Sequence, residues 1–239
     1  MTSAPAKNAI GGKMLTMRSV DRYPEGEVNE STDPEDSKAE RVTEDNDALP
    51  EKFDLDFCAD YAESHMPDGI TATFSTIDEN GAQIAVGRFR NDTGKDVLLN
   101  LECSYGDENG EFWGGGVSSQ PLLREGDEYI EVFDIGEEYQ SYMVDCQISD
   151  VPDGVYLHYD ATSVEDRKNA DGSVGYKVTS NDPDGYNLLI RAFFFDDEGE
   201  IIGYTSADIG GSGNWDWDQM EIPSVEYDSY KVIWSYNNI

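Results

Sequence analysis

The sequence predicts an all-β protein of two tandem antiparallel β-sandwiches, preceded by a disordered acidic N-terminal segment. Three observations lead to this prediction. Short motifs recur in the same order along residues 67–239, apolar residues alternate with polar ones with a period of two, and turn-forming residues separate these runs at intervals of about 10 to 15 residues. Short strands at such spacing are typical of antiparallel sandwiches.

The internal repeat sets the domain organisation. Four motifs return in order: Pro67-Asp68-Gly69-Ile70 as Pro152-Asp153-Gly154-Val155, Val86-Gly87 as Val174-Gly175, Gly110-Glu111 as Gly199-Glu200, and Glu138-Tyr139-x-Ser141-Tyr142 as Glu226-Tyr227-x-Ser229-Tyr230. The first motif is offset by 85 residues and the last by 88. A doubling of this size indicates two copies of one small domain. We place them at residues 51–151 and 152–239, after a linker of residues 1–50.

The linker is expected to be disordered. It is rich in Pro, Glu, Asp, Ser, Thr and Asn, and the stretch from Glu25 to Asp47 has hardly any apolar residue to bury. Such a stretch cannot offset the entropy lost on ordering.

The next element is predicted from a short alternation. Apolar Phe53, Leu55 and Phe57 are interleaved with Asp54 and Asp56, which predicts an extra N-terminal strand at residues 53–58. This strand is either an added edge strand of the first module or the last strand of a lost upstream copy.

Inside the two copies, matched strands carry matched apolar faces. Leu99, Leu101, Cys103 and Tyr105 correspond to Leu188, Ile190, Ala192 and Phe194, and Tyr142, Val144, Cys146 and Ile148 correspond to Tyr230, Val232, Trp234 and Tyr236. Clusters of Asn, Asp and Gly lie between the strands, and these residues tolerate the positive φ that tight hairpins require. No 12-residue window shows convincing helical periodicity.

Charge is the extreme property of the composition. The chain has 51 Asp and Glu against 16 Lys and Arg, a net charge of -35. Residues 1–50 hold 11 acidic and 6 basic side chains, a net of -5, so -30 remains on residues 51–239. This surface repels phosphate backbones and anionic lipids, which excludes nucleic acid and membrane surfaces as expected partners. The acidity either keeps the protein soluble or serves a cation or a basic partner.

No run of about 20 apolar residues that could span a membrane is present. The first 20 residues carry Lys7, Lys13 and Arg18 without the apolar stretch of a secretory signal. The chain is therefore expected either to be intracellular or to begin after its targeting segment.

Three cysteines are present: Cys58, Cys103 and Cys146. In the repeat alignment Cys103 matches Ala192 and Cys146 matches Trp234, which suggests that the two thiols lie on neighbouring strands in the core. A Cys103–Cys146 disulfide is one hypothesis and would imply an oxidising compartment. Two buried free thiols are the alternative.

The order of motifs resembles the FxLYD-type bacterial and archaeal surface modules. The resemblance rests on Val86-Gly87-x-Phe89-x-Asn91, Val97-Leu98-Leu99-x-Leu101, the hairpin from Tyr105 to Gly110, Pro121-Leu122 with Glu125-Gly126-Asp127, and Tyr139-x-Ser141-Tyr142. It implies two immunoglobulin-like sandwiches, an extracellular or cell-envelope location as in lipoproteins, and no family-wide catalytic residue. In the second copy, Gly210-Gly211-Ser212-Gly213 stands where the family has a turn of the Pro-x-Gly type.

Candidate chemistry is sparse. An EF-hand needs Glu at loop position 12, but the pattern that begins at Ser180 has Arg191 there and the one that begins at Thr76 has Gly87. These turns are either loose calcium sites or ordinary hairpin turns. Only His65 and His158 could supply imidazole, and no Cys-x-x-Cys pair, nucleophile elbow or phosphate loop occurs. We therefore predict no metal, no cofactor and no enzymatic activity.

Aromatic residues give the remaining functional lead. Trp113, Tyr204, Trp215 and Trp217 lie among polar neighbours, and Trp215 and Trp217 are expected to share one face of a strand. Such rings either stack on sugars or cap a small core.

The first hypothesis for function is a non-catalytic cell-surface or secreted module that acts as a spacer or binds protein or glycan at the envelope. The alternative is a carbohydrate-binding accessory module that uses the tryptophans.

Overall fold

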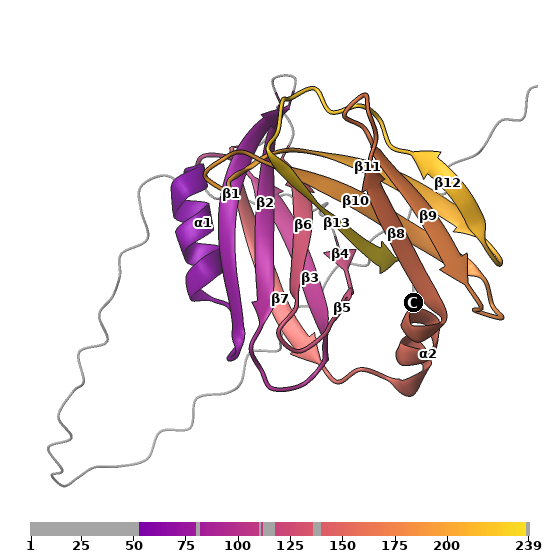
Figure 1. The fold of residues 1–239 in the computed structure, drawn as a ribbon. Helices are drawn as coiled ribbons and strands as arrows, with labels where there is room; N and C mark the ends of the chain where they lie inside the picture. Colours follow the sequence, from indigo (N-terminus) through magenta and orange to yellow (C-terminus); the bar gives the residue numbers. More distant parts are fainter. Residues whose placement is uncertain (1–52, 80–81, 110, 112–117, 136–139, 238–239) are drawn as a thin grey trace, which may run out of the picture. The chain divides into compact units, whose positions relative to one another are not determined.

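The computed structural model shows a mostly β protein whose antiparallel sheets form two similar domains (Figure 1). The structure describes residues 53–79, 82–109, 111, 118–135 and 140–237. The disordered linker predicted for residues 1–50 lies outside the described residues. The boundary predicted between residues 151 and 152 falls between the last strand of the first domain and the first helix of the second.

Each domain begins with one short helix and continues with strands. The first domain contains α1 (Leu55–Ser64), β1 (Ile70–Glu79), β2 (Ala82–Asn91), β3 (Val97–Gly106), β4 (Ser118–Ser119), β5 (Leu122–Leu123), β6 (Glu128–Asp134) and β7 (Ser141–Ser149). The second contains α2 (Asp153–Ala161), β8 (Thr162–Lys168), β9 (Val174–Ser180), β10 (Tyr186–Phe195), β11 (Ile201–Gly211), β12 (Trp215–Gln219) and β13 (Ser229–Tyr236).

The two domains share one sheet topology. In the first, one sheet has the order β1-β2-β6, and in the other β3 is flanked by β7 on one side and by β4 and β5 on the other. In the second, the corresponding sheets are β8-β9-β12 and β11-β10-β13. The alternating apolar residues of β3 and β10 point into the core of their own domain, where they are buried.

Strand register supports the same equivalence. Leu101 lies opposite Cys146 in the pair β3–β7, and Ile190 lies opposite Trp234 in the pair β10–β13. The predicted match of Cys146 to Trp234 therefore holds at the level of individual residue pairs. A slip of one residue would turn every side chain to the other face. The agreement of these residue pairs is therefore a strict test of the equivalence between the strands.

The turn after the central strand is also repeated. The side chain of Asp107 accepts hydrogen bonds from the backbone N–H groups of Asn109 and Glu111 at 2.9 and 3.0 Å. Asp196 accepts the equivalent bonds from Glu198 and Glu200 at 3.0 and 2.9 Å. Each aspartate thus satisfies two N–H groups that the tight turn leaves without backbone partners.

The strand predicted at residues 53–58 is wrong, because the segment forms the start of α1. Asp54 caps this helix by accepting a hydrogen bond from the N–H of Phe57 at 2.9 Å. Cys58 and Ala62, four residues apart, are the buried face of the helix. An alternation of five residues is too short to exclude a helix, because the second buried residue of this helix, Ala62, lies beyond the alternating run.

The first repeat motif does not mark equivalent positions. Gly69 has a φ of +82° before β1, and a Cβ there would lie 2.8 Å from the Thr93 side chain. Gly154 instead belongs to α2, with Val155 and Tyr159 on the buried face of that helix. The two Pro-Asp-Gly sequences therefore form a turn in one domain and a helix start in the other.

A third apolar cluster joins the two domains, in addition to the core of each. It combines residues of β1, β2 and β6 with residues of β10 and β11: Ile77, Ile84, Val86, Ile130, Val132, Phe193, Phe195 and Ile201. Phe193 has no exposed surface. The face of the sheet β1-β2-β6 that points away from the first core is thus covered by the second domain.

Replacement of Phe193 by Ala should destabilise the protein by about 3 to 5 kcal/mol, because it removes a fully buried ring from this cluster. The matched control is Leu157→Ala in α2, where the side chain is 72% exposed and the change should stay within about 0.5 kcal/mol. Urea unfolding measures both. Equal effects of the two substitutions would contradict the buried interface.

Candidate functional site

The predicted aromatic residues do not form one platform. Trp113 lies outside the described residues. Tyr204 is half-buried on β11, where its ring stacks on Phe193 at a centroid distance of 6.2 Å and packs against the cluster between the domains. Tyr204 therefore contributes to the domain interface.

Trp215 and Trp217 lie on the edge strand β12, but the prediction that they share one face is wrong. Trp215 pairs with Val178, whose side chain belongs to the second core, while Asp218 pairs with Tyr176. The shifted register between these pairs marks a bulge that places an extra residue on β12, so Trp217 lies on the outer face.

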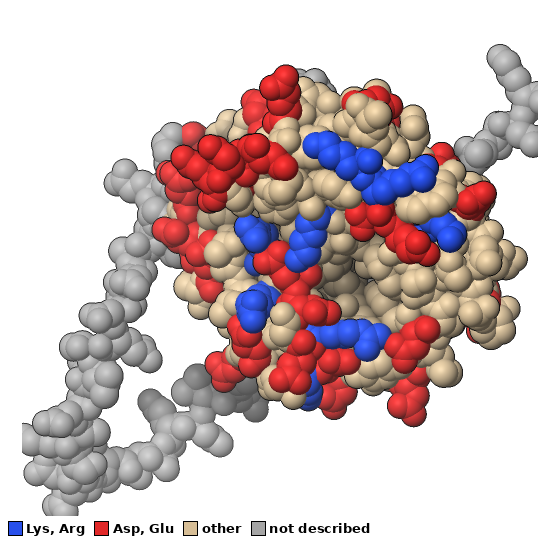
Figure 2. Space-filling view, viewed as in Figure 1, with Lys and Arg blue, Asp and Glu red and all other residues tan. Residues whose placement is uncertain are grey.

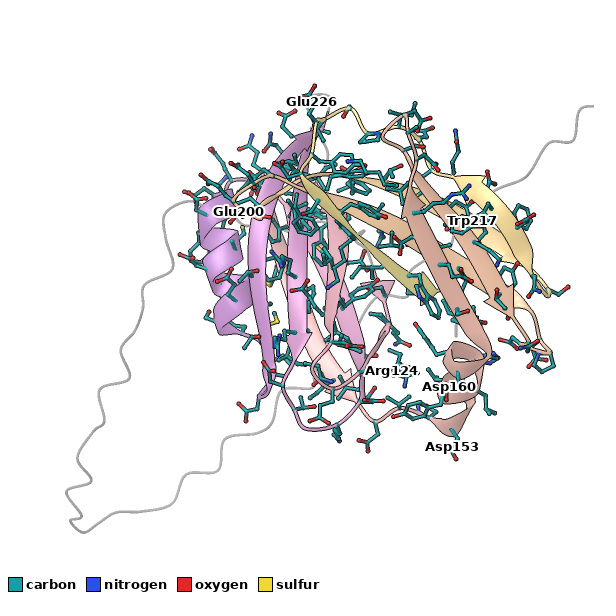
Figure 3. All side chains as sticks on the ribbon, in the orientation of Figure 1. Arg124, Asp153, Asp160, Glu200, Trp217 and Glu226 are labelled. Atoms are coloured by element: carbon teal, nitrogen blue, oxygen red, sulfur yellow. The ribbon has the colours of Figure 1, made fainter. Side chains whose placement is uncertain are left out.

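Trp217 is also covered by a cation. The guanidinium carbon of Arg167 lies 4.1 Å from the centroid of a Trp217 ring. Arg167 is paired with Gly175 on β9, and the glycine leaves room for the arginine stem, since a Cβ there would lie 3.4 Å from Cγ of Arg167. Figure 3 shows Trp217 on β12 at the outer side of the second domain. Trp215, 41% exposed, is the ring that remains accessible.

The three cysteines are free thiols in the structure, and all are buried. Cys103 lies opposite Val144 and Cys146 lies opposite Leu101, so the two thiols occupy diagonal positions on β3 and β7. Diagonal neighbours have Cα atoms roughly 7 to 8 Å apart, whereas a disulfide needs about 4.4 to 6.8 Å. The predicted Cys103–Cys146 disulfide therefore does not fit this register.

The thiols should be unreactive in the native protein. Burial raises the pKa of Cys103 and of Cys146 to about 12, so both are protonated at neutral pH. We expect almost no reaction of these two thiols with a thiol reagent at pH 8. After unfolding without reductant, all three cysteines should react. One reactive thiol per unfolded chain would instead reveal a disulfide.

A buried ion pair connects the domains. Arg191 on β10 forms an ion pair with Glu131 on β6, and the two side chains are 14% and 1% exposed. Glu131 also accepts hydrogen bonds from the hydroxyl of Tyr129 and the N–H of Val132, each at 3.0 Å. Because a buried charge without its partner is costly, this network favours one relative placement of β6 and β10.

Two further ion pairs cross the interface nearer to solvent. Glu128 on β6 accepts hydrogen bonds from Lys231 of the second domain at 2.9 Å and from Arg88 at 3.3 Å. Burial alone would raise the pKa of Glu128, but the two cations outweigh it and lower the pKa. Arg124, after β5, pairs with Asp160 of α2 at 2.7 Å (Figure 3).

Every Lys and Arg of the described residues contacts either a carboxylate or an aromatic ring. Ion pairs engage Arg88, Arg90, Lys95, Arg124, Lys177, Arg191 and Lys231. Arg167 and Lys168 lie over the rings of Trp217 and Tyr227. The face in Figure 2 is hollowed near its centre, and the basic side chains visible there lie around the hollow.

A cleft of about 320 Å³ opens between the domains. Leu122, Tyr129, Tyr159 and Trp234 supply apolar surface, and Lys231 is among its charged residues. Tyr159 of α2 stacks on Trp234 at 5.2 Å and accepts a hydrogen bond from the N–H of Leu122. The cleft thus lies where α2 of the second domain contacts Leu122 of the first domain.

Sequence reasoning missed a polar cluster at the end of the second domain. Nδ1 of His158 on α2 lies 2.6 Å from Oδ2 of Asp182 in the turn after β9, and Tyr236 donates a hydrogen bond to the same oxygen at 3.1 Å. Burial alone would raise the pKa of Asp182, but hydrogen bonds from His158, the Asp184 N–H and Tyr236 lower it. The acidic turn could be recognised in the sequence. Its histidine partner could not, because His158 lies on α2, a helix that the sequence did not predict.

No protein-family model matches this chain, and no curated protein sequence does. Among the described residues, no helix is both long and apolar enough to span a bilayer.

Proposed function

We propose that the protein is a non-catalytic interaction and spacer module that presents two immunoglobulin-like domains at a fixed angle. The observation that carries this proposal is the buried contact between the domains, in which an apolar cluster and the buried Arg191–Glu131 pair both link β6 to β10. Adjacent domains that share a small polar contact move relative to each other. A large apolar contact with a buried ion pair opposes that motion.

The resemblance to FxLYD-type modules supports a cell-surface or secreted location within this proposal. The shared topology of the two domains is compatible with a tandem of small sandwiches. A surface with a net charge of -30 on residues 51–239 favours solubility and repels other acidic surfaces. A protein partner at the envelope would accordingly present basic or neutral surface to this module.

The spacer proposal is tested by the distance between two spin labels. Cysteines introduced at exposed Glu102 on β3 and exposed Ser163 on β8 can be labelled selectively, because the native thiols are buried. We expect a narrow distance distribution. Arg191→Ala, which leaves Glu131 unpaired in the interface, should broaden it.

The matched control is Lys177→Ala, which removes an ion pair to Glu165 inside the second domain and should leave the distribution unchanged. A broad distribution in the unmodified protein would refute a rigid spacer. Turnover of a hydrolase substrate by the purified chain would refute the non-catalytic assignment.

A second candidate, a carbohydrate-binding accessory module, rests on Trp215 alone among the described tryptophans. Its ring is 41% exposed and Asp216 and Asp218 lie beside it on β12. If the candidate is right, Trp215→Ala should abolish binding to an array of oligosaccharides, while Ile222→Ala, a loss of another exposed apolar side chain, should not. Absence of any sugar binding by the unmodified chain removes this candidate.

A further inference from the structure

His158, Asp182 and Asp184 form a compact group of metal-ligating side chains. Their ligand atoms all lie within 4.8 Å of one another, and no other group of three His, Cys, Asp or Glu with such geometry occurs in the described part of the chain. We propose that these three residues bind a divalent transition metal ion, for which zinc is the reference ion. The site is independent of the domain contact on which the proposed function rests.

The donor set selects the class of metal. One imidazole nitrogen and two carboxylates are ligands typical of zinc and related ions, and three protein ligands leave a position for water. Calcium instead takes six to eight oxygen ligands. The turn has Asp182, Asp184 and Gly185 at EF-hand positions but lacks the closing glutamate, and in the fold His158 of α2 adds a nitrogen ligand beside the two aspartates.

Asp182 is a buried carboxylate without a Lys or Arg partner in the described part of the chain. Its side chain is 1% exposed, yet every ion pair made by the Lys and Arg of the described residues goes to another carboxylate. The direct partners of Asp182 are His158, the hydroxyl of Tyr236 and the N–H of Asp184. A buried carboxylate with mostly neutral donors is well placed to gain from a bound cation.

Hydrogen bonds behind the ligands hold them in place. Tyr236, which donates to Asp182, is itself bonded to Thr162 at 2.7 Å, and Thr162 is bonded to Ser180 at 2.7 Å. The ring of His158 also packs on that of Tyr236, with centroids 5.7 Å apart. Partners of this kind orient metal ligands in established metal sites.

The site is reachable from solvent and needs little rearrangement. A pocket of about 300 Å³ is lined by His158, Asp184 and Tyr236. Ligands of a tetrahedral zinc ion lie roughly 3.4 Å apart for bonds of about 2.0 to 2.1 Å. His158 and Asp182 are already closer than this, and Asp184 is an exposed turn residue that can rotate towards them.

A metal at this site would tie together three parts of the second domain. His158 belongs to α2, the two aspartates to the turn between β9 and β10, and Tyr236 to the end of β13. Because the ion would bind the folded chain and not the unfolded one, it should stabilise the domain in proportion to its occupancy.

The test is a zinc titration of the full, tag-free chain after treatment with a chelator. Calorimetry should show one zinc ion per chain at a specific site, and the melting temperature should rise with zinc. His158→Ala should weaken the affinity by at least about tenfold. The matched control is His65→Ala, which removes the only other histidine, exposed after α1, and should retain full affinity.

A second variant covers the case in which His158→Ala perturbs folding. Asp184→Asn changes an exposed carboxylate, so it should keep the melting temperature of the metal-free protein and still lose zinc affinity. The proposal is overturned if zinc does not bind, if both histidine variants bind it equally, or if excess magnesium abolishes binding as it would on a merely acidic surface. Calcium binding at these residues in preference to zinc would overturn it as well.

Discussion

The structure depends on the contact between the outer face of the sheet β1-β2-β6 and the strands β10 and β11. An antiparallel sheet can leave one face in water, but here that face carries Ile84, Val86, Ile130 and Val132 and is covered by the second domain. Each of the two similar domains therefore has two apolar surfaces, one in its own core and one in contact with the other domain. Buried apolar area supplies the stability of this contact, and the Arg191–Glu131 pair sets its geometry.

The small number of basic residues explains why most of the Lys and Arg side chains are used in ion pairs. With 51 acidic and 16 basic residues, few Lys and Arg are available to offset repulsion. Three of them, Arg124, Arg191 and Lys231, join the two domains through acidic partners. Many of the other carboxylates are exposed, at turns and on the outer faces of strands, where water solvates them. Asp182 differs from these exposed carboxylates because it is buried and lies beside a histidine.

The sequence predicted the mostly β class and the presence of two similar domains because both rest on patterns repeated over many residues. The matched strands and the correspondence of Cys146 with Trp234 follow from the period of two and from the offset between the two repeats. Both helices were missed, since each has only two buried residues, and α1 begins inside an alternating run. The bulge in β12 and the contact between domains have no signature in local spacing, so the position of Trp217 and the role of Tyr204 were misjudged.

Because the two domains share a buried face, we infer that they form one folding unit. All described residues fall in one compact unit, as this claim requires. Differential scanning calorimetry tests it most directly. We expect a single transition in which the calorimetric and van't Hoff enthalpies agree. Two separable transitions, each with the enthalpy of roughly half the chain, would show that the domains unfold independently and would contradict it.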